Sequence, residues 1–212
     1  MVRRLPVYLL LDTSGSMKGE PIESVKVGLE AMVSSLRKDP FALESVHLSI
    51  ITFDREVKDI LPLTELENLT LPDIITPESG PTHLGMALEL LYERCNKEFI
   101  RGSSTQKGDW KPLLFIMTDG KPSDMAKYQE FIPKIQSLGF GSIVACAAGP
   151  KSNSESLKLL TENVVHLDTT DSSTFSHFFK WVSASVSIGN RSQGSGDNNE
   201  LPPPPPDVHP VI

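Results

Sequence analysis

The sequence is short of cysteine, of clustered basic residues and of long apolar runs, and each shortage excludes a class of protein. The two cysteines, Cys95 and Cys146, lie far apart among apolar neighbours and lack CxxC spacing, so we expect buried free thiols, which permits a reducing compartment. With a net charge of −7 and no basic patch or tail, the chain is not expected to bind nucleic acid. No stretch approaches the roughly 20 apolar residues of a membrane span.

The N-terminal residues do not have the pattern of a secretory signal. Arg3 and Arg4 precede an uncharged run, Leu5 to Leu11, which ends at Asp12. A signal peptide needs a longer apolar region and a small-residue cleavage site, so we expect a cytoplasmic protein. The length of 212 residues and the 39% hydrophobic content fit one globular α/β domain rather than two.

Strand-like and helix-like patterns alternate along residues 5–188. The continuous apolar run 5–11 predicts a buried central strand, and apolar residues at three- and four-residue spacing predict a helix over 22–36 that ends before Pro40. Further strands are expected at 46–53, 57–61, 113–117, 143–147 and 164–167, and further helices at 84–95, 125–138, 154–160 and 175–186.

This alternation predicts a Rossmann-like α/β fold, with a mostly parallel central sheet and helices on both faces. The connection between strands 46–53 and 57–61 is too short for a helical crossover, so this pair should be antiparallel and supply one antiparallel edge strand. Residues 62–81, rich in Pro, Thr, Asn and Asp, are expected to form a loop.

The composition changes at Gly189. Residues 189–212 lack periodic apolar residues and include five consecutive prolines, Pro202–Pro206. We therefore divide the chain into a folded domain, residues 1–188, and a disordered Gly/Ser/Pro-rich tail, residues 189–212. The prolines would form a stiff polyproline II rod, which we expect to be solvated rather than to act as a docking peptide.

Oxygen-bearing side chains gather where two predicted strands end. Asp12, Ser14 and Ser16 occupy alternate positions after the first strand, and Asp119 follows the strand at 113–117. Ligands of parallel α/β sheets bind beyond the carboxyl ends of the strands, where the topology switches direction. Carboxylate and hydroxyl oxygens suit a hard divalent cation such as Mg²⁺, and Thr82 could supply one more hydroxyl.

Each of these residues also has a structural explanation when it is taken alone. Asp and Ser favour turns, Ser16 and Thr82 could each cap a following helix, and Asp119-Gly120 is a common turn signal. Five residues in this order and in these contexts favour the metal site instead. His83 is expected to be a surface residue at a helix start rather than a metal ligand. Lys121 and Asp124 are expected to be solvated loop charges rather than contacts to a partner.

The ordered pattern DTSGS, a lone threonine and TDG resembles the metal-ion-dependent adhesion site of von Willebrand factor type A (vWA) domains. Asp12, Ser14 and Ser16 match the DxSxS element, Thr82 the isolated threonine, and Asp119 the final aspartate. The segments RLPVYLLLDTSGSMKGEPIESV, VHLSIITFD, PLTEL and TQKGDWKPLLFIMTDGKPSD are similar to the bacterial tellurite-resistance TerY-type family, a resemblance that covers nearly all of residues 1–188. Pro81, where glycine is commoner, and His83 depart from the pattern.

The resemblance implies a protein-binding module. In such domains the metal, here expected to be Mg²⁺ with Mn²⁺ or Ca²⁺ as alternatives, keeps an open coordination position that an Asp or Glu carboxylate of a protein partner fills. The TerY-type resemblance adds kinase- or phosphatase-like partners in stress signalling. It does not predict the oligomeric state.

The sequence argues against an enzyme. A two-aspartate phosphatase needs DxD where this chain has Asp12-Thr13-Ser14, and neither GxSxG nor GxxxxGK[ST] is present. A metal-dependent hydrolase needs a general base beside the metal, and only His83 is near the motif. Two alternatives to the interaction module stay open: a structural domain that the metal staples together and, less favoured, such a hydrolase.

Overall fold

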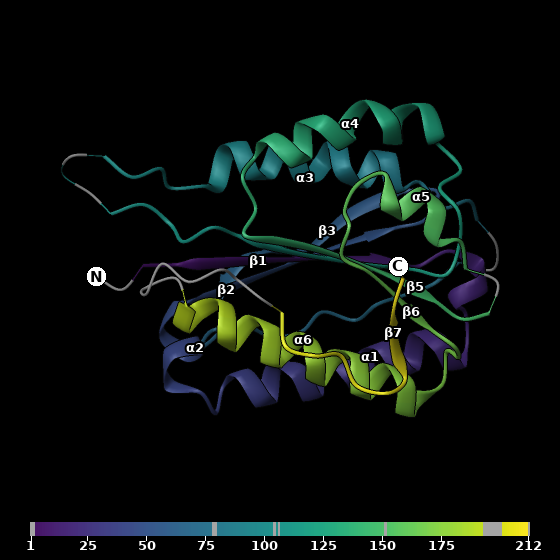
Figure 1. Cartoon of the computed structure of the whole chain (residues 1–212), viewed down its shortest axis with the longest axis horizontal. Helices are drawn as coiled ribbons and strands as arrows, with labels where there is room; N and C mark the ends of the chain where they lie inside the picture. Colours follow the sequence, from purple (N-terminus) through teal and green to yellow (C-terminus); the bar gives the residue numbers. More distant parts are fainter. Residues whose placement is uncertain are drawn as a thin grey trace.

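The computed structural model describes residues 3–77, 80–103, 105, 107–150, 152–192 and 201–211. Among these residues, seven strands form one sheet in the order β3-β2-β1-β4-β5-β6-β7 (Figure 1). The strands are β1 (Leu5–Asp12), β2 (Val46–Phe53), β3 (Val57–Glu65), β4 (Leu113–Thr118), β5 (Ser142–Ala148), β6 (Val164–Leu167) and β7 (Val208–Pro210). Strands β1, β2, β4, β5 and β6 run parallel, whereas β3 and β7 pair antiparallel with β2 and β6.

Helices cover both faces of the sheet (Figure 1). On one face lie α1 (Glu20–Leu36), α2 (Pro40–Ser45) and α6 (Ser172–Ser192), and on the other lie α3 (Leu84–Glu98), α4 (Met125–Ser137) and α5 (Ser154–Lys158). A short 3-10 helix, η1 (Gly15–Met17), follows β1. Within the part of the chain that the structure describes, no helix has the length and apolar character required to cross a membrane.

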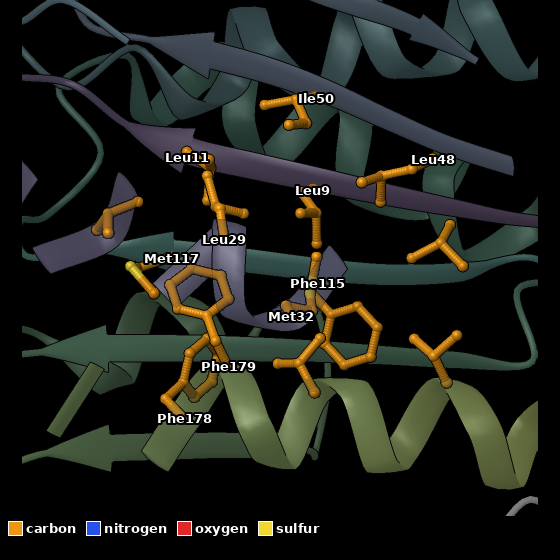
Figure 2. Close-up of a cluster of buried hydrophobic side chains, with 14 of the residues drawn as sticks. Leu9, Leu11, Leu29, Met32, Leu48, Ile50, Phe115, Met117, Phe178 and Phe179 are labelled. Carbon is orange, nitrogen blue, oxygen red and sulfur yellow. The ribbon is translucent and has the colours of Figure 1, made fainter. Parts of the chain in front are cut away.

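Apolar side chains pack on both faces because successive residues of a strand point to opposite sides. From β1, Leu9 and Leu11 enter the core beneath α1 and α6, while Tyr8 and Leu10 enter the core beneath α3 and α4. Figure 2 shows the first of these cores, where side chains of β1, β2 and β4 meet those of α1 and α6. This burial on both faces explains why β1 is a continuous apolar run.

The order of the strands places a topological switch at β1. The chain leaves β1 through α1 to β2 on one side, and later returns to β4 on the other side of β1. Leu11 of β1 is in register with Met117 of β4, so Asp12 and Thr118 end neighbouring parallel strands. The carboxyl ends of β1 and β4 therefore form the crevice in which such sheets bind ligands.

The predicted fold class is confirmed, and the strands at 46–53 and 164–167 have the predicted bounds. Strand β3 continues to Glu65, into the predicted loop, because it lies at the sheet edge, where Pro62 needs no backbone donor. Helix α2 was not expected: Pro40 not only ends the preceding helix but opens a new one, which the Asp39 carboxylate caps by accepting from Phe41 N at 3.0 Å. Both cysteines are free and buried, as expected.

The C-terminal region differs from the disordered tail that the sequence predicts. Helix α6 continues to Ser192, and residues 201–211 lie against the domain, where Val208 in β7 is only 1% exposed. Trp181 Nε1 of α6 donates to the Pro202 carbonyl at 2.8 Å, and Leu201 packs on the core. A polyproline segment is already extended and loses little conformational entropy on docking, and the pairing of β7 with β6 adds backbone hydrogen bonds to these apolar contacts. The predicted tail residues 193–200 and 212 lie outside the described residues.

Candidate metal centre

The carboxylate of Asp12 is buried at the carboxyl end of β1, with the residue only 1% exposed. Its Oδ1 accepts from Ser14 N at 2.8 Å, and its Oδ2 accepts from Thr118 Oγ1 at 2.6 Å. Burial raises the pKa of Asp12 to about 6, with a smaller contribution from the charge of Asp119, although the Ser14 and Thr118 bonds oppose the shift. The negative charge of this group is therefore under-compensated by the protein alone.

The loop after β1 curls so that its serine hydroxyls face one another. Met17 N donates to Ser14 O at 2.9 Å, which closes η1, and the fully buried Met17 side chain fixes this turn on the core. As a result, Ser14 Oγ and Ser16 Oγ lie 3.2 Å apart. Ser14 is buried whereas Ser16 is exposed, so the row of oxygens leads from the interior to the surface.

Asp119 joins this row from the neighbouring strand. It directly follows β4, and its Oδ1 accepts from Ser16 Oγ at 2.9 Å. Burial raises the pKa of Asp119, while the bond from Ser16 opposes that shift. Two carboxylates that are both partly or fully removed from water thus lie at the ends of a chain of hydroxyl groups, and in the part of the chain that the structure describes no cationic side chain is bonded to either.

Thr82 approaches the same region from the loop that precedes α3. It is 7% exposed, and its backbone N donates to Ser123 Oγ at 3.1 Å. A Cβ added at Gly120 would come within 3.2 Å of Thr82 Oγ1, so this hydroxyl borders the loop that carries Asp119. The structure therefore brings all five predicted residues to one end of the sheet: four form a hydrogen-bonded row, and the Thr82 hydroxyl lies beside Gly120, the residue after Asp119.

The chemistry of these groups fits a hard divalent cation. The donors are carboxylate and hydroxyl oxygens, which Mg²⁺ and similar ions prefer. Within the described residues, no three His, Cys, Asp or Glu side chains are arranged to hold a metal ion, so a cation at this place must rely on hydroxyl ligands. A positive charge here would compensate the buried carboxylate of Asp12.

The expectation that Asp124 is a solvated loop charge is wrong. Its Oδ1 accepts from Gly85 N at 3.0 Å and its Oδ2 from Met86 N at 2.8 Å, so the side chain caps α3. Asp124 immediately precedes α4, and the sequence gives no sign that it caps a different helix. Lys121 is exposed, and His83 stands at the start of α3, as expected, with Nδ1 3.0 Å from the Arg55 carbonyl oxygen.

Thr118, which bonds to the buried carboxylate of Asp12, was also missed by the sequence analysis. It precedes Asp119 in the TDG segment, so its position beside the motif was a usable signal. A cavity of about 780 Å³ lies at the opposite ends of the strands, near Arg4 and Asp109. Those two side chains form an ion pair of 2.7 Å with each other, and the cavity does not adjoin the candidate metal centre.

A family model described as the von Willebrand factor type A domain matches residues 7–181. An uncharacterized protein from Synechocystis sp. is 30% identical over 124 residues, which cover 56% of this chain and 26% of that protein. The chain thus spans about a quarter of the length of the curated relative that it matches.

Solved structures share the fold at low identity. Proximal thread matrix protein 1 from the mussel byssus, described with a zinc-occupied MIDAS motif, is 18% identical with a TM-score of 0.64, and the match covers 86% of this chain and 48% of that chain. The pilus adhesin SpaC from Lactobacillus rhamnosus GG is 12% identical with a TM-score of 0.68, over 88% and 31% of the two chains. At these identities the likeness concerns the fold.

Proposed function

This chain belongs to the von Willebrand factor type A domain family, and from that premise we propose that it is a non-enzymatic module that binds a protein partner through a divalent cation. Domains of this family are generally non-catalytic and commonly mediate metal-dependent protein interactions. One observation carries the proposal: the buried Asp12 carboxylate begins a row of oxygens that reaches the surface through Ser14, Ser16 and Asp119.

The residues that would hold the cation are Asp12, Ser14, Ser16, Thr82 and Asp119. Three of them contribute neutral hydroxyls and two contribute carboxylates, so the chain would supply five oxygen ligands and leave a sixth position of an octahedral ion such as Mg²⁺ for a further carboxylate. Because Ser16 is exposed, the site is open to solvent on that side, where an Asp or Glu of a partner could approach. We favour Mg²⁺ over Mn²⁺ or Ca²⁺ as the bound ion. Because the motif of the mussel protein is described as occupied by zinc, Zn²⁺ should be tested beside these three ions in binding measurements.

The cellular role that we propose rests on the sequence resemblance to the TerY-type family. It is a cytoplasmic adaptor in bacterial tellurite resistance or a related stress response, with kinase- or phosphatase-like proteins as partners. The sequence segments quoted above support this assignment, and identification of the partner tests it.

A structural role for the metal is the second candidate. It is favoured by the burial of Asp12 and by the position of the site between loops of two strands, which a cation would hold together. A hydrolase is less favoured because, among the described residues, the hydrogen bond of the His83 imidazole goes to the Arg55 carbonyl and not to a residue of the candidate metal centre. The two leading candidates differ in whether a partner responds to the metal.

The test is capture of partners from native lysate by the immobilised domain, in Mg²⁺ and in EDTA, with identification by mass spectrometry. We expect a partner that appears in Mg²⁺ and is lost in EDTA and with Asp12→Ala. The control is Asp73→Ala, which removes an exposed carboxylate that pairs with Lys26 away from the site. Identical captures in both buffers would refute the adaptor and favour the structural role.

A further inference from the structure

Two loops that approach the candidate metal centre from different helices are bound to each other. Thr82, before α3, donates its backbone N–H to Ser123 Oγ at 3.1 Å, and its carbonyl accepts from Ser123 N at 2.8 Å. Ser123 belongs to the loop that begins with Asp119 and leads into α4. One serine therefore holds both backbone polar groups of Thr82 against the Asp119 loop.

The next residue strengthens this connection. The Asp124 carboxylate accepts from the backbone N–H groups of Gly85 and Met86, at 3.0 and 2.8 Å, in the first turn of α3. A negative charge at the N-terminus of a helix is also favoured by the helix dipole. A Cβ added at Gly85 would lie 2.4 Å from Tyr128 N of α4, so the starts of the two helices touch without a side chain between them. Thr82 and the Asp119 loop are thus one packed unit.

A second contact joins Thr82's neighbour to the loop that carries Asp12. His83 N donates to the Asp54 carbonyl at 3.1 Å, and Asp54 Oδ2 accepts from Thr13 Oγ1 at 2.8 Å. Thr13 lies between Asp12 and Ser14, and it is 1% exposed while Asp54 is 8% exposed. The Asp54 side chain also accepts from Glu56 N at 2.9 Å, which fixes its orientation.

We propose that Ser123, Asp124 and Asp54 are positioning residues that set the Thr82 hydroxyl relative to the Asp12 and Asp119 loops before a cation binds. The inference rests on the proposed function, since it concerns the same centre. Thr82 lies on a different loop from the other candidate ligands. If that loop became ordered only when the metal bound, the conformational entropy lost would lower the affinity for the metal. Ligands held by surrounding hydrogen bonds avoid that loss, and Mg²⁺ and similar ions tolerate little misplacement of ligands.

The alternative is that Ser123 only stabilises the fold, as many loop serines do. The two roles differ in what the loss of the hydroxyl changes. A positioning role predicts weaker metal binding with nearly unchanged stability of the metal-free domain, and the effect must pass through Thr82. A stabilising role predicts a lower melting temperature in EDTA and no dependence on Thr82.

The experiment measures Mn²⁺ affinity by electron paramagnetic resonance, and the melting temperature in EDTA, for the whole chain. Ser123→Ala should bind Mn²⁺ about tenfold more weakly, and Ser123→Thr, which keeps the hydroxyl, should restore most of the affinity. In a Thr82→Val background, Ser123→Ala should cause no further loss, because its effect acts through Thr82. The control is Ser137→Ala, whose hydroxyl bonds to Lys134 O at the far end of α4.

The outcomes separate this inference from the proposed function. If the wild-type chain fails to bind Mn²⁺, the proposed metal function falls, and the positioning role falls with it. If the wild type binds Mn²⁺ and Ser123→Ala binds it equally well, only the positioning role is refuted. An additive loss in the double variant would also refute it, since Ser123 would then act independently of Thr82.

Discussion

Replacing the buried acid of the candidate metal centre by its amide should stabilise the metal-free protein. Burial raises the pKa of Asp12 from 3.8 to about 6, so the folded state holds the proton more tightly than the unfolded state does. The contribution of this group to the free energy of unfolding is therefore greatest at low pH, and it is lost as the pH rises from about 4 to 6. At roughly 1.4 kcal/mol per pKa unit, the ionised carboxylate costs the fold about 3 kcal/mol above pH 7.

Asp12→Asn removes that cost while keeping most of the hydrogen bonds. The amide oxygen can still accept from Ser14 N, and the amide nitrogen can donate to Thr118 Oγ1 in place of accepting from it. In EDTA, we expect the variant to gain up to about 3 kcal/mol in the free energy of unfolding at pH 8, and roughly half of that at pH 5.

The assay is urea unfolding in EDTA at both pH values, followed by circular dichroism, with Asp73→Asn as an exposed control. In saturating Mg²⁺ the order should reverse or narrow, because the cation stabilises the wild type by mass action and the variant lacks a charged ligand. An Asp12→Asn variant that is no more stable than the wild type in EDTA, or whose gain does not grow with pH, would refute the reasoning.

Three further predictions follow from the same structure. Because Asp12 must lose its proton to bind a cation, Mg²⁺ affinity measured by calorimetry should fall about tenfold per pH unit below pH 6 and level off above pH 7; a flat profile would contradict this. Deleting residues 201–212 should lower the free energy of unfolding by about 3 kcal/mol, because Val208 and its apolar neighbours lose burial, whereas unchanged stability would restore the disordered-tail prediction. Gly85→Ala should cost about 2 kcal/mol or more, since the added Cβ meets the α4 backbone; a melting temperature equal to that of Ser137→Ala would disprove the close contact.

The sequence predicts the parts of this fold that depend on local pattern. The run 5–11 is continuously apolar because both faces of β1 are covered, so the sequence alone predicts its place at the centre of the sheet. The order Asp12, Ser14, Ser16, with Asp119 at a second strand end, identifies which edge of the sheet to examine. That expectation needs only the rule that the carboxyl ends of parallel strands lie at the same end of a sheet, where ligands bind.

What the sequence could not predict depends on contacts between distant segments. Val208 and Leu201 are isolated apolar residues in a Pro-rich stretch, and they form no periodic pattern until β6 and α6 are in place. Asp124 precedes one helix but caps another, which requires the packing of α3 on α4. Both misses arise because turn- and Pro-rich segments were assumed to be solvated, whereas here tertiary contacts satisfy their backbone groups.

The most direct test of the central claim is a crystal structure of the chain grown with Mn²⁺ and measured at a wavelength that gives anomalous scattering from the metal. The account predicts one anomalous peak among the oxygens of Asp12, Ser14, Ser16, Thr82 and Asp119, with at least one coordination position taken by water or by a carboxylate from outside the chain. A peak elsewhere, no peak at this edge of the sheet, or an ion whose ligands all come from the chain would contradict it.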